Sequence, residues 1–307
     1  MILIRNLCTT LLLLSGQLIY AQSNWQPNKE ELAGPLKFLA SPLLEGRQTG
    51  TRGCMIAAEY IATTMEQYGL LPAGEAGWFQ DYDYKGLTAR NVIGMIKGTD
   101  TTNYVILTAH YDHLGMRNDS IFVGADDNAS GVSGMLALAK FWRHQHQLPS
   151  CNLIFVAISA EETEILGSLH FVENFAPGIE SVLLNMNFDM IARSDPKDTL
   201  CNILEIGILK ERTDYKEMLE RLNASSNTPF VLDFWESDGN GGSDYKHFAA
   251  NGIPIIAFFT GLNGDYHTPA DTPDKIDWNK MIRVLELANK CLVDFFDRIK
   301  SDRTEAH

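Results

Sequence analysis

The hydrophobic pattern of the chain alternates between continuous apolar runs and stretches with helical spacing. The runs RNVIGMIKG, YVILTAH, CNLIFVAIS, SVLLNMNFDMIA, CNILEIG and PIIAFFTG have the length and composition of buried strands. Helical spacing occurs in ELAGPLKFLASPLLEG, RGCMIAAEYIATTMEQYGL, NASGVSGMLALAKFWRHQHQ, a polar stretch near 211–223 and the closing WNKMIRVLELANKCLVDFFDRIK. This alternation predicts one α/β domain whose mostly parallel central sheet has helices on both faces.

The first residues have a different pattern. MILIRNLCTTLLLLSGQLIYAQS contains an early positive charge at Arg5, an apolar stretch and the small residue Ala21 before a polar segment. This is the layout of a secretory signal peptide. We expect residues 1–21 to be removed and residues 22–307 to form a single domain, secreted or periplasmic, with no membrane insertion after cleavage. An uncleaved N-terminal anchor is the alternative. Cys8 lacks a preceding lipoprotein-type triplet of small residues, so we do not expect a lipid anchor.

Composition narrows the classes of partner. The chain has 39 acidic and 25 basic residues and a formal net charge of −14, which argues against binding nucleic acid or an anionic membrane. The sequence does not indicate an oligomeric state. No CxxC motif is present, so no thiolate zinc site is expected. The cysteines after residue 21 are either paired in disulfides or buried as free thiols: Cys54, Cys151, Cys201 and Cys291.

Five stretches place acidic or imidazole side chains beside the ends of the predicted strands. They are HYDHLG (110–115), GADDNASG (124–131), AISAEETEILGS (157–168), NMNFDM (185–190) and GDYHTPADT (264–272). Ligands of such sheets bind beyond the carboxyl ends of the strands. Carboxylates and imidazoles gathered there would repel and desolvate one another unless a cation lay between them. Their coincidence therefore predicts a metal site.

Taken singly, each of these side chains has an ordinary structural explanation. Asp127 could cap a helix, and Glu161 with Glu162 could form a solvated first helical turn. Asp189 could cap a turn, and His267 could be an exposed loop residue. Together, two histidines and three carboxylates suit zinc, with cobalt and manganese as second choices. A catalytic zinc typically keeps three protein ligands, so five ligands favour two ions that share one bridging carboxylate.

The five stretches, in this order, resemble the co-catalytic zinc aminopeptidases, a family with exported bacterial leucyl-type enzymes and with glutamate carboxypeptidase and glutaminyl cyclases as relatives. The resemblance extends from about residue 35 to about residue 295 and includes LASPLLEGRQTGTRGCMIAAEYIATTMEQYGLLPAG. It implies two Zn²⁺ ions per chain. One would be bound by His110 and Asp189 and the other by Glu162 and His267, with Asp127 as the bridge. Asp126 would occupy a variable place in the motif.

The resemblance also implies an activity, which is the hydrolysis of N-terminal residues from peptide substrates. Glu161 matches the general base, and Asp112 would accept a hydrogen bond from the imidazole of His110. The zinc pair would lower the pKa of bound water from about 16 toward 7. Tyr245 stands where histidine is common in the family, and it would either line the substrate pocket or pack. His113 is expected in the pocket or behind the ligands rather than on a metal.

Three alternatives follow from the same motifs. A glutaminyl cyclase shares the fold but uses one zinc and tends to have tryptophan before the last histidine, where this chain has Tyr266. A non-catalytic binding module would have lost a ligand or the base, and none is lost here. A carboxypeptidase needs an arginine cluster for the substrate carboxylate. Near the motifs only Arg90, Arg117 and Arg193 qualify, and they do not cluster in sequence. An aminopeptidase is therefore favoured.

Overall fold

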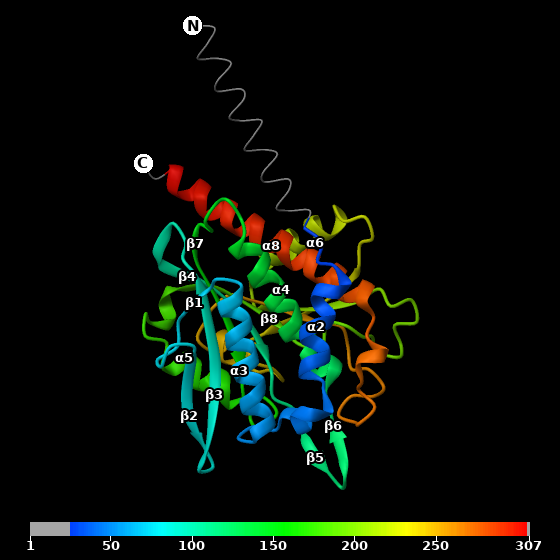
Figure 1. The fold of residues 1–307 in the computed structure, drawn as a ribbon. Coiled ribbons are helices and arrows are strands. Elements are labelled where there is room, and N and C mark those ends of the chain that lie inside the picture. The colour runs from blue at the N-terminus through cyan, green and yellow to red at the C-terminus, as the bar shows by residue number, and fades with distance from the viewer. Residues whose placement is uncertain (1–24, 306–307) are drawn as a thin grey trace, which may run out of the picture.

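The computed structural model describes residues 25–305, and Figure 1 shows how their helices and strands are arranged. The predicted signal peptide, residues 1–21, and Cys8 lie outside the described residues. Within the described part of the chain, no helix is both long enough and apolar enough to cross a bilayer.

One sheet of nine strands forms the centre of residues 25–305, in the order β1-β3-β7-β4-β8-β11-β9-β10 with β2 paired to β3. Neighbours β7, β4, β8 and β11 are parallel, as are β9 and β10. The pairs of β3 with β1, β2 and β7 and the pair of β9 with β11 are antiparallel. The strands are β1 (Leu71–Pro72), β2 (Phe79–Tyr84), β3 (Leu87–Ile96), β4 (Asp100–His110), β7 (Cys151–Ile158), β8 (Val182–Phe188), β9 (Ile203–Leu209), β10 (Val231–Ser237) and β11 (Ile255–Phe259); β5 (Gly115–Arg117) and β6 (Ser120–Phe122) form a separate ribbon.

Helices cover both faces of this sheet, which confirms the predicted fold class. Figure 1 shows α2, α3, α4 and α8 on the side toward the viewer. Val105 and Leu107 of β4 belong to the core under these helices, whereas Ile106 belongs to the core under α5 and α7. A strand buried on both faces reads as a continuous apolar run. The helices are α2 (Lys29–Leu39), α3 (Arg52–Gln67), α4 (Gly131–Arg143), α5 (Leu166–Glu173), α6 (Thr213–Ala224), α7 (Tyr245–Ala250) and α8 (Trp278–Glu305), with short 3-10 helices η1 (Pro42–Arg47), η3 (Ile179–Ser181) and η4 (Pro273–Lys275).

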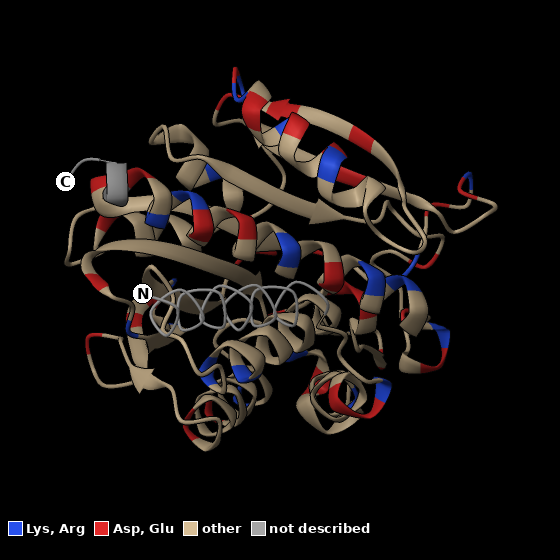
Figure 2. Ribbon diagram, turned by 90° about the horizontal axis from the view of Figure 1, so that it is seen from above, with Lys and Arg blue, Asp and Glu red and all other residues tan. Residues whose placement is uncertain are grey.

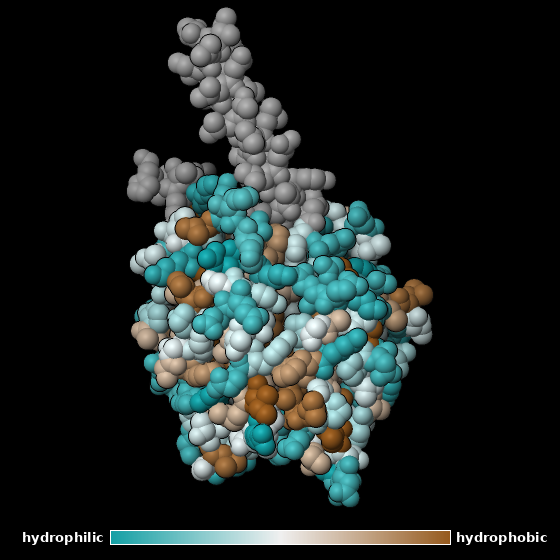
Figure 3. Space-filling view, in the orientation of Figure 1, coloured by the Kyte–Doolittle hydropathy of each residue, from teal (hydrophilic) through white to brown (hydrophobic). Residues whose placement is uncertain are grey.

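The helical surface is mainly polar. Acidic and basic residues are interspersed along α8, as Figure 2 shows, rather than separated into regions of one sign. On the face drawn in Figure 3, hydrophilic side chains predominate, and apolar ones form small separate groups. The face drawn in Figure 3 therefore shows no broad apolar patch.

The first predicted helix is shorter than its apolar spacing suggested. The helix α2 ends at Leu39, and the chain turns at Ser41 into η1, because the residue before Pro42 is disfavoured in a helix. The buried guanidinium of Arg47, at the end of η1, donates to the carbonyl oxygens of Tyr111 (2.7 Å), Val123 (2.6 Å), Gly124 (3.0 Å) and Leu39. This bend connects the N-terminal helices to two of the loops that carry candidate ligands.

The four described cysteines form no disulfide with one another. Cys54, Cys151 and Cys291 are buried thiols outside any disulfide, which is one of the two states the sequence allowed. Cys201 is also free but exposed, so the expectation that it starts a buried strand was wrong. It precedes β9, whose first residue is Ile203.

Candidate metal centre

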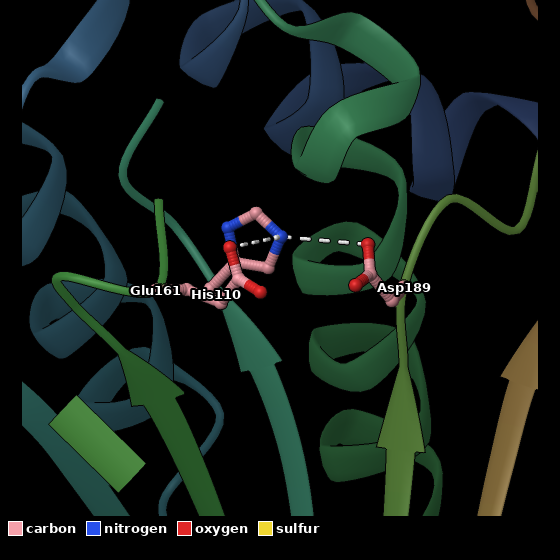
Figure 4. A group of neighbouring side chains, drawn as sticks. All are labelled: His110, Glu161 and Asp189. Atoms are coloured by element: carbon pink, nitrogen blue, oxygen red, sulfur yellow. Dashed lines mark hydrogen bonds and ion pairs between the residues drawn. The ribbon is translucent and has the colours of Figure 1, made fainter. Parts of the chain in front are cut away.

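The loops that follow four parallel strands bring the predicted ligands together. Because β7, β4, β8 and β11 are neighbours, their carboxyl ends meet at one edge of the sheet. Figure 4 shows His110, Glu161 and Asp189 converging there from three strands. His110 is the last residue of β4, Glu161 and Glu162 follow β7, Asp189 follows β8, His267 lies in the loop after β11, and Asp127 lies in the segment Ala125–Ser130 before α4.

Asp127 lies between the two predicted histidine ligands. Its Oδ1 is 3.4 Å from Nε2 of His110, and its Oδ2 is 3.1 Å from Nε2 of His267. Asp189 Oδ1 is also 3.4 Å from the His110 Nε2, and Glu162 Oε2 is 3.1 Å from the His267 Nε2. Atoms bound to one tetrahedral zinc at about 2.0–2.2 Å lie roughly 3.3–3.6 Å apart. The two pairs at His110 match this spacing, and the two pairs at His267 are slightly closer. The spacing therefore suits two metal sites that share Asp127.

The charges at this edge also suit a divalent metal. Among the described residues, no lysine or arginine forms an ion pair with Asp127, Glu161, Glu162 or Asp189. Burial lowers the pKa of His110, but the carboxylates of Glu161 and Asp189 outweigh this effect and raise it well above its ordinary value. Burial likewise lowers the pKa of His267, whereas its hydrogen bonds to Asp127 and Glu162 raise it to about 9. Protons on the histidines supply positive charge that bound cations would replace.

His113 lies behind one of the candidate ligands, as its weaker sequence signal suggested. Its Nδ1 is 2.7 Å from Oε1 of Glu162, while the other Glu162 oxygen faces His267. Burial raises the pKa of Glu162, but the hydrogen bonds from His113 and His267 outweigh it, and the net pKa is lowered. His113 Nε2 is buried without a hydrogen-bond partner. The imidazole of His113 thus fixes the orientation of the Glu162 carboxylate.

Asp112 contacts the candidate base as well as His110. Its Oδ2 accepts a hydrogen bond from the Thr49 hydroxyl at 2.8 Å, and its Oδ1 accepts the backbone N–H of Glu161 at 3.2 Å. The distance from Asp112 Oδ1 to Nδ1 of His110 is 3.8 Å, which is longer than a hydrogen bond. The imidazole Nδ1 instead lies 3.3 Å from the Asp112 carbonyl oxygen. The carboxylate therefore orients the loop of Glu161, and the expected hydrogen bond from His110 is absent.

The motif segments contain two further buried carboxylates, Asp126 and Asp271, to which the sequence assigned no role. Asp271 is fully buried, and its Oδ2 accepts the backbone N–H groups of Asp126 and Asp127, each at 3.0 Å. Asp126 points away from the ligands and accepts from the Ala192 N–H at 2.9 Å and the Asn263 amide at 3.0 Å. These bonds hold the segment that carries Asp127. The only sequence signal was the TPAD stretch after His267.

A third buried carboxylate, Asp244, lies close to the candidate base. Burial raises its pKa to about 7, partly opposed by the positive charge of His110. Burial also raises the pKa of Glu161 well above its ordinary value; His110 opposes this increase, and the charges of Asp189 and Asp244 add to it. Glu161 is therefore placed among like charges, where it readily takes up a proton.

A cavity of about 360 Å³ opens beside the candidate ligands. Tyr245, at the start of α7, lines this cavity, so its position agrees with the prediction that it borders a pocket. Its side chain is also buried, and the centroid of its ring lies 6.2 Å from that of Trp235. Among the described residues that line the cavity, none is a lysine or an arginine. Arg90 pairs with Asp81 at 2.8 Å and Arg193 with Asp265 at 2.7 Å. Neither arginine faces the cavity.

Comparison with known proteins identifies the family. The chain belongs to peptidase family M28, whose family model matches residues 91–292, more than half of the chain. Aminopeptidase YwaD of Bacillus subtilis is 28% identical over 71% of this chain and 47% of its own length. A probable leucine aminopeptidase 2 of Aspergillus fumigatus is 30% identical over 75% of this chain and 47% of its own length. The chain thus spans about half the length of these curated relatives.

Solved structures share the fold at low sequence identity. The LapA aminopeptidase of Legionella pneumophila superposes with a TM-score of 0.75 at 18% identity, covering 92% of this chain and 74% of that one. A zinc aminopeptidase from Bacillus subtilis gives 0.71 at 18% identity, covering 88% and 96%. A glutaminyl cyclase of Bacteroides thetaiotaomicron gives 0.68 at 19% identity, covering 88% and 98%. Because these neighbours carry different activities on one fold, the function of this chain depends on its own side chains.

Proposed function

We propose that the protein is a zinc-dependent aminopeptidase that uses two zinc ions per chain to hydrolyse N-terminal residues from peptides. The observation that carries this proposal is the position of Asp127, which presents one carboxylate oxygen to His110 and the other to His267. A carboxylate that only capped a helix would have no reason to lie between two imidazoles.

Each side chain has a role in this reaction. His110 and Asp189 would hold one zinc and Glu162 and His267 the other, with Asp127 shared. When bound, such a pair lowers the pKa of water and polarises a carbonyl group. Glu161 has its Oε2 3.9 Å from the His110 Nε2 and faces the same space. It would accept the proton of the attacking water and return that proton to the leaving amine.

An exopeptidase must also recognise one end of its substrate. A free α-ammonium group is attracted by the carboxylates that line the cavity, which include Glu161 and Asp189. A free α-carboxylate would need an arginine or lysine, and the described cavity lining has neither. The charge of the cavity therefore favours an aminopeptidase over a carboxypeptidase.

The decisive experiment combines metal analysis with one conservative variant. The purified protein is expected to bind two zinc ions per chain and to release free amino acids from aminoacyl anilides, with activity lost on chelation. Glu161→Gln should keep both zinc ions yet lose about 10²–10⁴-fold in kcat, because an amide cannot carry the proton. The exposed Glu164→Gln, three residues away, is the matched control and should keep full activity.

Three results would contradict the proposal. Full activity in Glu161→Gln would remove the assigned base. Release of ammonia from an N-terminal glutaminyl peptide, with one zinc per chain and no amino acid release, would indicate a glutaminyl cyclase. Absence of bound zinc together with absence of hydrolysis would indicate a binding module.

We propose in addition that the chain is exported, so that the enzyme acts in the periplasm or outside the cell. The basis is the N-terminal pattern of Arg5, the apolar stretch and Ala21. Fractionation of cells that express the full chain should recover a mature protein lacking residues 1–21 outside the cytoplasm. Recovery of the intact chain in the cytoplasm would refute export.

A further inference from the structure

The cavity beside the candidate metal centre combines apolar walls with one carboxylate remote from the metal ligands. Phe259, Leu262 and Trp235 contribute apolar surface to it. Glu205, which is none of the predicted ligands, lies on its border. A carboxylate that borders apolar side chains and lies apart from the candidate ligands is a feature that simple packing does not explain.

The register of the sheet fixes where Glu205 lies relative to the metal centre. Phe259 of β11 is directly opposite Glu205 of β9. On the other side of β11, the N–H of Asp189 bonds to the carbonyl oxygen of Phe258 at 3.2 Å, so Asp189 borders the same end of β11. Strands are about 4.8 Å apart, so two strand spacings place Glu205 roughly 10 Å from Asp189. The carboxylate is thus beyond the reacting atoms but within the same cavity.

The wall of the cavity near Glu205 is aromatic. On β9 and β10, Gly207 is opposite Trp235, and a Cβ added to Gly207 would lie only 2.5 Å from the indole ring. The glycine therefore allows the indole to lie over the sheet, beside the ring of Tyr245 at 6.2 Å. Aromatic faces attract both the aliphatic stem and the cationic head of a long basic side chain.

Glu205 has no positively charged partner of its own. Among the described residues, its carboxylate makes no hydrogen bond or ion pair. The nearby Lys280 is committed to Ser194 at 2.6 Å and to Asp198 at 3.0 Å. Burial raises the pKa of Glu205, and the neighbouring charges of Asp233 and Asp195 raise it further. The positive charge of Lys280 opposes this increase only in part. A cation brought by a ligand would relieve this unfavourable environment.

We propose that Glu205 determines substrate specificity by favouring lysine or arginine as the N-terminal residue, an inference that rests on the proposed aminopeptidase function. The α-ammonium group is attached directly to the α-carbon, beside the bond that is cleaved, and so stays near Asp189 and Glu161. Only a long side chain can extend across β11 past Phe259 and place its charge at Glu205. Leucine would occupy the aromatic part of the cavity without meeting the carboxylate.

The test compares two substrates of nearly equal shape. Lysyl and norleucyl anilides share an unbranched stem, and only the first ends in a cation. In the zinc-loaded wild-type protein, kcat/KM for the lysyl substrate should exceed that for the norleucyl substrate about tenfold, the lower part of the range for a charged hydrogen bond because Glu205 is partly exposed. Glu205→Gln should lower this ratio about tenfold. Glu236→Gln, an equal charge change at an exposed position of β10, is the control and should leave the ratio unaltered.

A second measurement needs no variant. L-Lysine should inhibit the wild-type protein about tenfold more strongly than L-norleucine, and the difference should shrink at high ionic strength. Equal inhibition at low salt, together with equal rates for both anilides, would overturn the inference while leaving the aminopeptidase function intact. An equal loss for both substrates in Glu205→Gln would show that the carboxylate does not read the side chain and would also overturn it. Absence of cleavage of every anilide would instead overturn the proposed function.

Discussion

Asp271 offers the most informative test of how the metal centre is held together, because it is not itself one of the candidate metal ligands. Its carboxylate accepts backbone N–H groups from Asp126 at 3.0 and 3.1 Å and from Asp127 at 3.0 Å. The change we consider is Asp271→Asn, which keeps the volume of the side chain and one oxygen acceptor. It removes the negative charge and turns an N–H donor toward backbone N–H groups.

The magnitude follows from the number of hydrogen bonds that lose their charged acceptor. A hydrogen bond to a charged group contributes about 1.5–3 kcal/mol and a neutral one about 0.5–1.5 kcal/mol. Two N–H groups therefore lose about 2 kcal/mol of unfolding free energy in total. Burial raises the pKa of Asp271, and the hydrogen bonds from the two N–H groups lower it only in part. Because burial of the charged carboxylate is itself unfavourable, the loss of stability should not exceed about 2 kcal/mol. For a domain of roughly 285 residues, about 2 kcal/mol lowers the Tm by roughly 3 °C.

Two assays measure this effect. Denaturant unfolding of the metal-free protein at pH 8 should show the loss of stability, and competition with a chelator should show zinc affinity reduced about 10–100-fold, as for other residues that position ligands. Asp274→Asn, an exposed position three residues on, is the matched control and should change neither quantity. If Asp271→Asn retains wild-type stability and zinc affinity, then Asp271 does not position Asp127 and our reading of this segment is wrong.

Two further predictions concern the protons and thiols of the protein. The pKa of His267 is raised to about 9, so at pH 7 the metal-free protein carries a proton there that zinc must displace. Calorimetric titration of zinc in buffers of different ionisation enthalpy should therefore detect proton release at pH 7 that diminishes as the pH rises through 9; release that does not depend on pH would contradict this assignment. A thiol reagent should modify only Cys201 in the folded chain lacking residues 1–21, since Cys54, Cys151 and Cys291 are buried and burial raises the pKa of Cys54 to about 12. Rapid modification of more than one thiol would refute this.

The sequence predicted the centre of the fold better than its edges. Strands such as β4 and β7 are buried on both faces, so their apolar runs are unmistakable. β2 and β10 lie at or near the borders of the sheet and alternate between partly buried and exposed positions, which left no continuous apolar run to recognise. The early end of α2 depends on Pro42 and on the hydrogen bonds of the buried Arg47 side chain. Pro42 is visible in the sequence, but the contacts of Arg47 appear only in the folded chain.

The candidate ligands could be predicted because their chemistry is unusual beside buried strands. His110 and Asp189 lie at the end of apolar runs, and Glu162 follows another such run within a few residues. The two buried carboxylates that act on this site from a distance in sequence could not be predicted. Asp271 holds the backbone of Asp127, and the charge of Asp244 raises the pKa of Glu161. Glu205 was also missed, because its place in the cavity depends on the antiparallel pairing of β9 with β11, and no local pattern encodes that pairing.

The antiparallel junction between β11 and β9 separates two parts of the molecule that can evolve at different rates. The catalytic chemistry proposed here depends on loops from β4, β7, β8 and β11, whereas Glu205 and Trp235, which would contact the substrate side chain, come from β9 and β10. Replacements on these outer strands leave every candidate ligand in place. One ancestral hydrolase can therefore give rise to enzymes with different substrate specificities, each cleaving a different set of peptides with the same metal ligands and base.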